Sequence, residues 1–204
     1  MLRALEERHG AELQRKFSSA SVAVCGLGGL GSNIALSLAR AGIGRLHLID
    51  FDRVDISNLN RQQYAVSQLS MYKTEALRNN LLAVFPYLDI VTDTVRVTEG
   101  NLAGLLAEDD IICEAFDRAE AKAMLVNGVM ETFPGKYLVA GSGMAGMSSS
   151  NSIRTRQVTK HFYLCGDGTS DIADGMGLVA SRVMLCAAHQ AHMVLRILAG
   201  EYEP

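Results

Sequence analysis

Apolar residues in this chain follow two alternating patterns: short uninterrupted runs, and longer stretches in which they recur every three or four positions. The first run, residues 21–25 (SVAVC), is apolar and rich in β-branched residues, which is typical of a buried parallel strand. Residues 30–40 (LGSNIALSLAR) are apolar at helical spacing, and residues 45–50 (RLHLID) form a second run. This order of strand, glycine-rich turn, helix and strand predicts a βαβ unit.

The same alternation continues along the chain. Further strands are expected at 88–94, with an extension over 95–97 left open, at 110–115 and at 136–140; helices are expected at 67–82, ended by Pro86, and at 101–106, 118–132 and 178–198. Residues 153–165 alternate apolar and polar positions, which favours late strands that are antiparallel at one edge of the sheet. Because no repeat or linker interrupts the pattern, we predict one α/β domain over residues 1–204. Its sheet is doubly wound, mostly parallel and Rossmann-like, with an antiparallel edge near the C-terminus.

Three segments fall outside this alternation. Residues 1–17 are typical of one amphipathic helix ahead of the first strand, and residues 141–151 (GSGMAGMSSSN) are typical of a flexible loop. Residues 166–177 form another expected loop, which carries Asp167, Asp171 and Asp174. For these carboxylates a solvated loop is a simpler interpretation than a metal site.

The glycine run between the first strand and its helix indicates a nucleotide. Gly26, Gly28, Gly29 and Gly31 let the backbone approach a phosphate without a Cβ in the way, while the helix N-terminus attracts negative charge. Asp50 ends the second strand, at the position where a βαβ unit places the acidic residue that binds ribose hydroxyls. The glycine pattern alone is weak, but its place between strand and helix, with Asp50 in register, strengthens it.

The segment after the second strand adds charged groups for which a dehydrogenase has no need. Arg61 and Lys73 are suited to holding phosphates, and Asp117, just beyond the strand at 110–115, is suited to Mg²⁺. Attack of a carboxylate on the α-phosphate of ATP requires such cations and a divalent metal, and it requires no general base because the nucleophile is already ionised. The two motifs together therefore indicate ATP rather than NAD.

Each of these residues also has a simpler interpretation. Arg61 and Lys73 taken singly are ordinary solvated charges, and Asp117 is placed to cap the helix that follows it. Asp52 is counted here among the nucleotide-binding candidates, although Asp52 and Asp55 are more simply turn and surface residues.

Composition narrows the class of protein. The 204 residues have a formal net charge of −3, the basic residues are dispersed, and aromatic residues make up 6% with no Trp, so a nucleic-acid partner is not expected. The N-terminal residues are charged, and no segment is long and apolar enough to span a bilayer. We therefore expect a cytoplasmic enzyme without a membrane partner.

The four cysteines, Cys25, Cys113, Cys165 and Cys186, form no CxxC pair, so a structural zinc site is not expected. Cys25 and Cys113 lie in apolar runs and are expected to behave as small hydrophobic residues. Cys165, beside Gly166, is the candidate for a reactive thiol, although a buried structural thiol is the preferred interpretation.

Two segments carry a resemblance to a known family. Residues 26–64 (GLGGLGSNIALSLARAGIGRLHLIDFDRVDISNLNRQQY) and 112–125 (ICEAFDRAEAKAML) resemble the ThiF and MoeB family of ubiquitin-activating-enzyme-like adenylyltransferases. The short variant called ThiF family 2 is most similar, since residues 165–168 (CGDG) and 180–198 also resemble it. The paired CxxC zinc motifs of longer family members are missing here.

The resemblance implies an activity and roles for particular residues. Family members use ATP and Mg²⁺, as homodimers, to adenylate the C-terminal glycine of a ubiquitin-fold sulfur carrier such as ThiS, which implies a role in thiamine (thiazole) biosynthesis. The resemblance assigns Asp50 to ribose, Asn58, Arg61 and Lys73 to phosphates, and Asp117 to the metal. It also assigns Arg8 to the ATP of the neighbouring subunit, with Arg3 and Arg15 as alternatives.

Other functions remain open at this point. The same chemistry is compatible with a MoaD-like carrier, or with a tRNA-bound or small carboxylate. A nicotinamide-dependent dehydrogenase and a nucleotide-binding sensor without catalytic activity are the alternatives from other classes. The glycine-rich residues 141–146 are compatible with a narrow path for a Gly-Gly tail, and equally with a plain loop.

Overall fold

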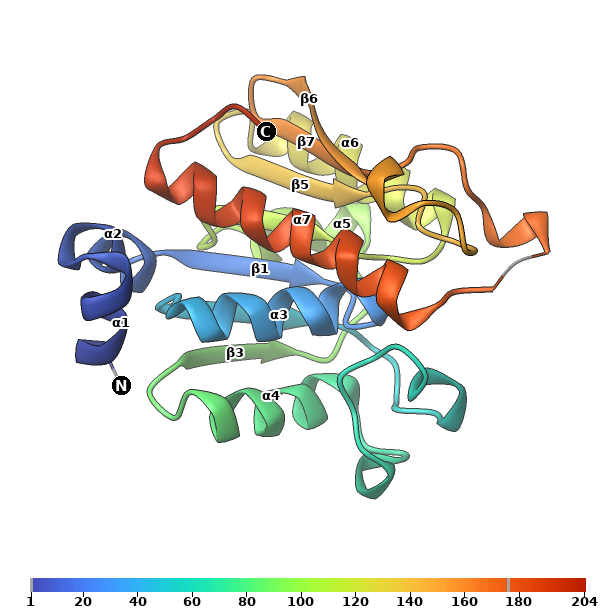
Figure 1. The fold of residues 1–204 in the computed structure, drawn as a ribbon, viewed down its shortest axis with the longest axis horizontal. Helices are drawn as coiled ribbons and strands as arrows, with labels where there is room; N and C mark the ends of the chain where they lie inside the picture. Colours follow the sequence, from blue (N-terminus) through green and yellow to red (C-terminus); the bar gives the residue numbers. More distant parts are fainter. Residues whose placement is uncertain (1, 176) are drawn as a thin grey trace.

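One mixed sheet runs through the centre of the molecule, with its strands in the order β3-β2-β1-β4-β5-β7-β6 (Figure 1). The computed structural model describes residues 2–175 and 177–204. The strands in this part of the chain are β1 (Ser21–Cys25), β2 (Arg45–Ile49), β3 (Asp89–Asp93), β4 (Ile111–Glu114), β5 (Tyr137–Gly141), β6 (Arg154–Thr159) and β7 (Phe162–Gly166). Neighbouring strands are parallel, except that β6 pairs antiparallel with β7 at one edge.

The order of the strands reverses next to β1. The chain passes from β1 outward to β2 and β3, and then returns to place β4 on the other side of β1. In such sheets the carboxyl ends of the two strands at the reversal point leave a crevice in which ligands bind. The predicted fold class, a doubly wound and mostly parallel sheet with an antiparallel edge near the C-terminus, is confirmed.

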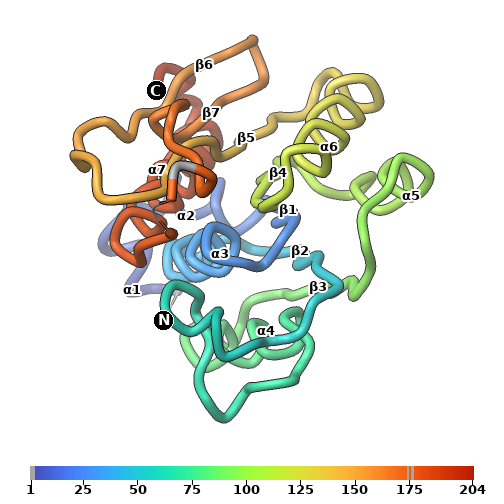
Figure 2. The backbone as a smooth tube through the Cα atoms, turned by 90° about the vertical axis from the view of Figure 1, so that its right-hand side faces the viewer, coloured from blue at the N-terminus to red at the C-terminus, as the bar shows by residue number. Residues whose placement is uncertain are grey.

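Helices cover both faces of the sheet (Figure 2). On one face lie α3 (Gly29–Ala41), α4 (Lys73–Val84) and α7 (Ala180–Ala199), and on the other lie α5 (Glu99–Leu105) and α6 (Ala119–Thr132). Val22 and Val24 of β1 pack into the core on the first face, and Ala23 and Cys25 pack into the core on the second. Because both faces are covered, the central strand β1 is buried at every position, which explains the apolar side chains at 22–25.

The N-terminal segment is two helices and not one, so the prediction of a single helix is wrong. Gly10, with φ of +86°, separates α1 (Leu2–His9) from α2 (Ala11–Ser18). A positive φ interrupts a helix, and glycine adopts it without steric cost. Both helices lie beyond the amino ends of the strands (Figure 1), where Gln14 donates a hydrogen bond to the carbonyl of Gly42 over 3.1 Å.

The helix expected over 67–82 begins later than predicted, at Lys73. Short 3-10 turns at η1 (Ile56–Asn58) and η2 (Val66–Gln68) precede it, and Ser70 has φ of +67°. The backbone N–H of Ser70 instead bonds the carbonyl of Val54, and that of Lys73 bonds the carbonyl of Asp52. These contacts fold the segment back on the loop after β2 and place Lys73 in the first turn of α4.

The remaining predicted elements are present with small shifts at their ends, except that β3 ends at Asp93 and residues 95–97 form no strand. The C-terminal helix α7 is 20 residues long, and β6 and β7 form the expected late hairpin. Within the described ranges, every helix is too short or too polar to cross a membrane.

A buried histidine in the middle of β2 lies between two acidic side chains. His47 of β2 contacts Asp109 over 2.9 Å and Asp93 over 2.8 Å, and the side chains of His47 and Asp109 are 8% and 2% exposed. Burial disfavours the charged imidazolium, but the hydrogen bonds and charges of the two carboxylates outweigh it, so the pKa of His47 is raised above 6.5.

We expect this histidine to make stability pH-dependent. A raised pKa in the folded state means that the stabilisation is fully present below pH 6.5 and is lost as pH rises through the pKa of the folded protein. His47→Gln should therefore lose most stability relative to wild type at acidic pH, with the difference shrinking as pH rises. Urea unfolding across this range measures it. His192→Gln, at an exposed position of α7, is the control, and an unchanged pH slope in His47→Gln would contradict the assignment.

Candidate active site

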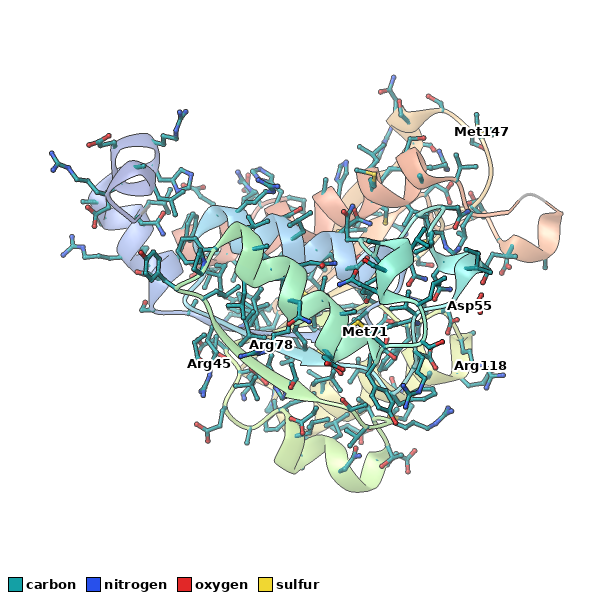
Figure 3. All side chains as sticks on the ribbon, turned by 90° about the horizontal axis from the view of Figure 1, so that it is seen from below. Arg45, Asp55, Met71, Arg78, Arg118 and Met147 are labelled. Carbon is teal, nitrogen blue, oxygen red and sulfur yellow. The ribbon has the colours of Figure 1, made fainter. Side chains whose placement is uncertain are left out.

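A cavity of about 1220 Å³ opens at the carboxyl ends of the parallel strands. Its walls come from the glycine turn after β1 and from the loops that follow β2, β3, β4, β5 and β7. Figure 3 shows Asp55, Arg118 and Met147, from the loops after β2, β4 and β5, at one end of the molecule, whereas Arg45 at the start of β2 lies toward the other end. The cavity therefore lies at the crevice formed by the reversal of strand order.

The glycine turn has no space for side chains at two of its positions. A Cβ at Gly31 would overlap the carbonyl oxygen of Gly26, and a Cβ at Gly26, where φ is +91°, would lie 2.8 Å from the carbonyl oxygen of Ala115. Gly28 is the N-cap of α3, with no side-chain cap. The first turn of α3 thus presents backbone N–H groups and the positive end of the helix dipole to the cavity, which suits an anion.

Asp50 lies at the floor of the cavity, directly after β2, and is 7% exposed. Its two carboxylate oxygens accept the backbone N–H groups of Leu27, over 2.7 Å, and of Asp52, over 2.8 Å. Burial raises the pKa of Asp50, while the nearby Lys73 ammonium and the two amides oppose the rise. A carboxylate has about four acceptor sites, so two remain for hydroxyl donors.

Lys73 and Asp52 form an ion pair beside this carboxylate. Lys73, 6% exposed, lies 2.9 Å from Asp52 and 4.0 Å from Asp50, measured from Nζ to the carboxylate oxygens. The structure therefore gives Asp52 a defined role as partner of Lys73, and it shows that Lys73 is buried rather than an ordinary solvated charge. Both residues line the cavity.

The 3-10 turn after β2 presents the amide and guanidinium groups that the sequence singled out. Asn58 Oδ1 accepts the backbone N–H of Asp55, and Arg61 donates to the Ser57 carbonyl and Asn60 Oδ1. Arg61 Nε is buried and has no partner among the described residues, and the same holds for Oε1 of the neighbouring Gln62. Asn58, Arg61 and Gln62 all line the cavity, so unsatisfied polar atoms lie in its wall.

Asp117 lies in the turn between β4 and α6, exposed and lining the cavity. The N-cap of α6 is Arg118, which makes no side-chain capping bond, so the capping role considered for Asp117 is not observed. The described residues contain no cluster of three or more His, Cys, Asp or Glu side chains arranged to hold a metal. A cation here would depend on one carboxylate together with a ligand's own oxygens.

One charged pair near Asp117 was missed by sequence reasoning. Glu114, the last residue of β4 and 1% exposed, accepts Lys122 Nζ through both oxygens, over 2.9 and 3.0 Å, and the backbone N–H of Phe116 over 2.7 Å. Lys122 also donates to the carbonyl of Gly141 over 2.9 Å. The pair thereby fastens the turn that carries Asp117 to the end of β5. Its signal in the sequence is a single acidic residue in the apolar run IICEAF.

The loop carboxylate Asp167 is not solvated, which corrects the simple interpretation given above. Its side chain is 7% exposed and forms an ion pair with Arg182 of α7. Burial acts to raise the pKa of Asp167, but backbone N–H groups of Ser170 and Thr169 and the Arg182 charge lower it to about 2. Arg182 also donates to the carbonyl of Ala145, in the loop expected over residues 141–151.

The cysteines and Arg8 lie away from the cavity. All four cysteines are buried, and burial raises the pKa of Cys165 to about 11, so its thiol is not placed to react. Arg8 belongs to α1, at the opposite end of the strands from the cavity within one chain (Figure 1). All of the predicted site residues except Arg8 and Gly31 line the cavity. Gly31 instead packs against the carbonyl of Gly26 within the glycine turn.

Comparison with solved structures shows the same fold. The E. coli tRNA N6-threonylcarbamoyladenosine dehydratase TcdA, solved in complex with ATP, superposes with a TM-score of 0.88 at 20% identity, covering 98% of this chain and 94% of that one. E. coli MccB superposes with a TM-score of 0.76 at 20% identity, covering 98% of this chain and 65% of that one. At these identities the likeness concerns the fold alone.

Sequence comparison identifies the family. The molybdopterin-synthase adenylyltransferase of Escherichia coli (strain K12) is 28% identical over 197 residues, which cover 94% of this chain and 78% of that protein. The adenylyltransferase and sulfurtransferase MOCS3 of Aedes aegypti is 35% identical over 136 residues, and the match spans 31% of its length. The names of these relatives agree with the expected enzyme class, an adenylyltransferase. Because the ThiF family model matches residues 2–204, the chain belongs to the ThiF family.

Proposed function

We propose that the cavity binds ATP and that the protein transfers AMP from it to a carboxylate. The observation that carries this proposal is the grouping, in one cavity, of an open helix N-terminus, a buried Asp50 and the two cations Arg61 and Lys73. Cations and backbone N–H groups on one side suit a phosphate chain, and a buried carboxylate beside them suits ribose hydroxyls.

The residues present fit this ligand. The buried Nε of Arg61 lacks an acceptor and Oε1 of Gln62 lacks a donor, as expected for groups that meet a polar ligand. The glycine turn brings the backbone close to the cavity where a Cβ would be obstructed. At about 1220 Å³ the cavity exceeds the roughly 300–1,000 Å³ typical of small-molecule sites, which leaves space for a second substrate.

The chemistry needs charge stabilisation more than proton transfer. The carboxylate oxygen attacks the α-phosphorus, and the bond from that phosphorus to the bridging oxygen breaks as pyrophosphate leaves. Arg61 and Lys73 orient the phosphates and offset the negative charge that develops on them. Asp117 is the residue that would hold Mg²⁺, which when bound neutralises charge on the phosphate oxygens.

The acyl substrate that we favour is the C-terminus of a ubiquitin-fold sulfur carrier. A MoaD-like carrier is supported by the relatives named molybdopterin-synthase adenylyltransferase. A ThiS-like carrier in thiamine biosynthesis remains the more specific alternative from the sequence, and a tRNA-bound carboxylate is the alternative compatible with the fold shared with TcdA.

The carrier-dependent exchange of pyrophosphate into ATP tests this function. We expect exchange with Mg-ATP and a MoaD-like or ThiS-like carrier ending in Gly-Gly, and a fall of about 10²-fold or more in Arg61→Ala and Asp117→Ala, because each removes a group that stabilises developing charge. Arg78→Ala, an exposed position on α4, is the matched control.

Three results would contradict the proposal or a part of it. Unchanged exchange in both variants would remove the roles of Arg61 and Asp117. Calorimetry that showed tighter binding of NAD(H) than of Mg-ATP would instead favour a dehydrogenase or a sensor, and exchange driven only by a modified tRNA would replace the carrier.

We further propose that the protein acts as a homodimer in which Arg8 reaches the ATP of the partner subunit. In one chain Arg8 is remote from the cavity and exposed, so a role in catalysis requires a second copy. Mixing Arg8→Ala with Asp117→Ala subunits should then restore about a quarter of wild-type exchange, because half of the dimers are mixed and each has one intact site. No recovery on mixing would exclude Arg8, and the same assay with Arg3→Ala or Arg15→Ala would identify its replacement.

A further inference from the structure

A buried arginine connects α7 to two loops of the cavity wall. Arg182 lies in the first turn of α7 and is 5% exposed, and each of its side-chain nitrogens donates within the protein. The acceptors are three main-chain carbonyls, one hydroxyl and one carboxylate: Ala145 O (3.1 Å), Ser148 O (2.7 Å), Ser149 O (2.9 Å), Ser152 Oγ (3.3 Å) and Asp167 Oδ2. One side chain therefore fixes the main chain over residues 145–152.

Asp167 extends this network into the second loop. Its Oδ1 accepts the backbone N–H groups of Thr169, over 2.9 Å, and Ser170, over 2.8 Å, as well as both hydroxyls. It also lies so close to Gly143 that a Cβ there would overlap it. Arg182 and Asp167 thus join the loop after β5 to the loop after β7.

These two loops form a wall of the cavity that is separate from the predicted phosphate contacts. Residues 142–145 and 170–172 line the cavity, whereas Arg61 and Lys73 come from the loop after β2 and the start of α4. No bond of Arg182 or Asp167 reaches Asp50, Asn58, Arg61, Lys73 or Asp117 in the described part of the chain.

Apolar packing anchors only part of the loop after β5, since Ala145 is buried and Met144 packs against the core while Met147 is exposed. Residues 141–151 are mostly Gly, Ser, Ala and Met, and the buried carbonyls that they bring need donors. An isolated buried ion pair is a poor source of stability compared with apolar packing, but a guanidinium with five donors suits the fixing of several carbonyls at once. The network therefore fixes the shape of this wall together with the backbone hydrogen bonds that Ser142 and Gly143 make to residues 165–168.

We propose that Arg182 and Asp167 are positioning residues for the acyl substrate, holding the loop after β5 in the shape that receives the incoming carboxylate chain. This inference depends on the proposed function. A loop that is already ordered does not have to be ordered when the substrate binds, so its release should weaken acyl-substrate binding while nucleotide binding is kept.

Arg182→Lys tests the inference, because lysine keeps the charge but cannot reach five acceptors. We expect the KM for a MoaD-like carrier to rise about tenfold while the Kd for ATP by calorimetry stays within about twofold. Cleavage between residues 142 and 152 by a protease of broad specificity should become about tenfold faster. Asp167→Asn is the second variant. Arg196→Met, on the same helix and remote from the cavity, is the matched control.

The outcomes separate this inference from the proposed function. Equal carrier KM values in Arg182→Lys and Arg196→Met, with normal exchange in the wild type, would overturn the inference alone. A parallel rise in the KM for the carrier and the Kd for ATP would also overturn it, since the network would then support the whole cavity. Absence of exchange in the wild type with every carrier would instead contradict the proposed function. If cleavage of the loop were also unaltered in Arg182→Lys and Asp167→Asn, the role of these residues in holding the loop would be contradicted as well.

Discussion

The geometry of the cavity depends on one buried carboxylate. Asp50 is held by the amide of Leu27 in the glycine turn and by the amide of Asp52 after β2, and Lys73 lies 4.0 Å away. A buried anion is tolerated only where donors surround it, so the turn, the loop and the start of α4 have to stay close together. Asp50 thereby holds together the glycine turn, the loop after β2 and the start of α4, which are distant in sequence.

Around this point, two cations of the cavity wall already have acidic partners. Lys73 is paired with Asp52 and Lys122 with Glu114, whereas Arg61 donates to neutral oxygens and keeps a buried Nε without a partner in the described structure. Of these three cations, Arg61 is thus the one whose charge no carboxylate offsets. An anionic ligand can engage it without first displacing an ion pair, while contact with Lys73 requires sharing it with Asp52.

Local patterns were sufficient to predict the sheet and most of the cavity floor. The apolar runs predicted the strands, and the helical periodicity predicted the helices. The glycine turn, Asp50, Arg61 and Lys73 followed from short sequence motifs. The helix boundary at Lys73 was missed because it depends on long-range bonds. The same is true of the Arg182 network, whose contacts cross 15 to 37 residues along the chain.

The contacts of Arg182 are mainly with carbonyl oxygens, which every amino acid has. Exchange of the side chains at Met147, Ser148 or Ser149 therefore removes none of these bonds, and Met147 itself is 69% exposed. The exposed side chains of the loop after β5 can consequently change during evolution, while hydrogen bonds from Arg182 of α7 keep the path of its main chain.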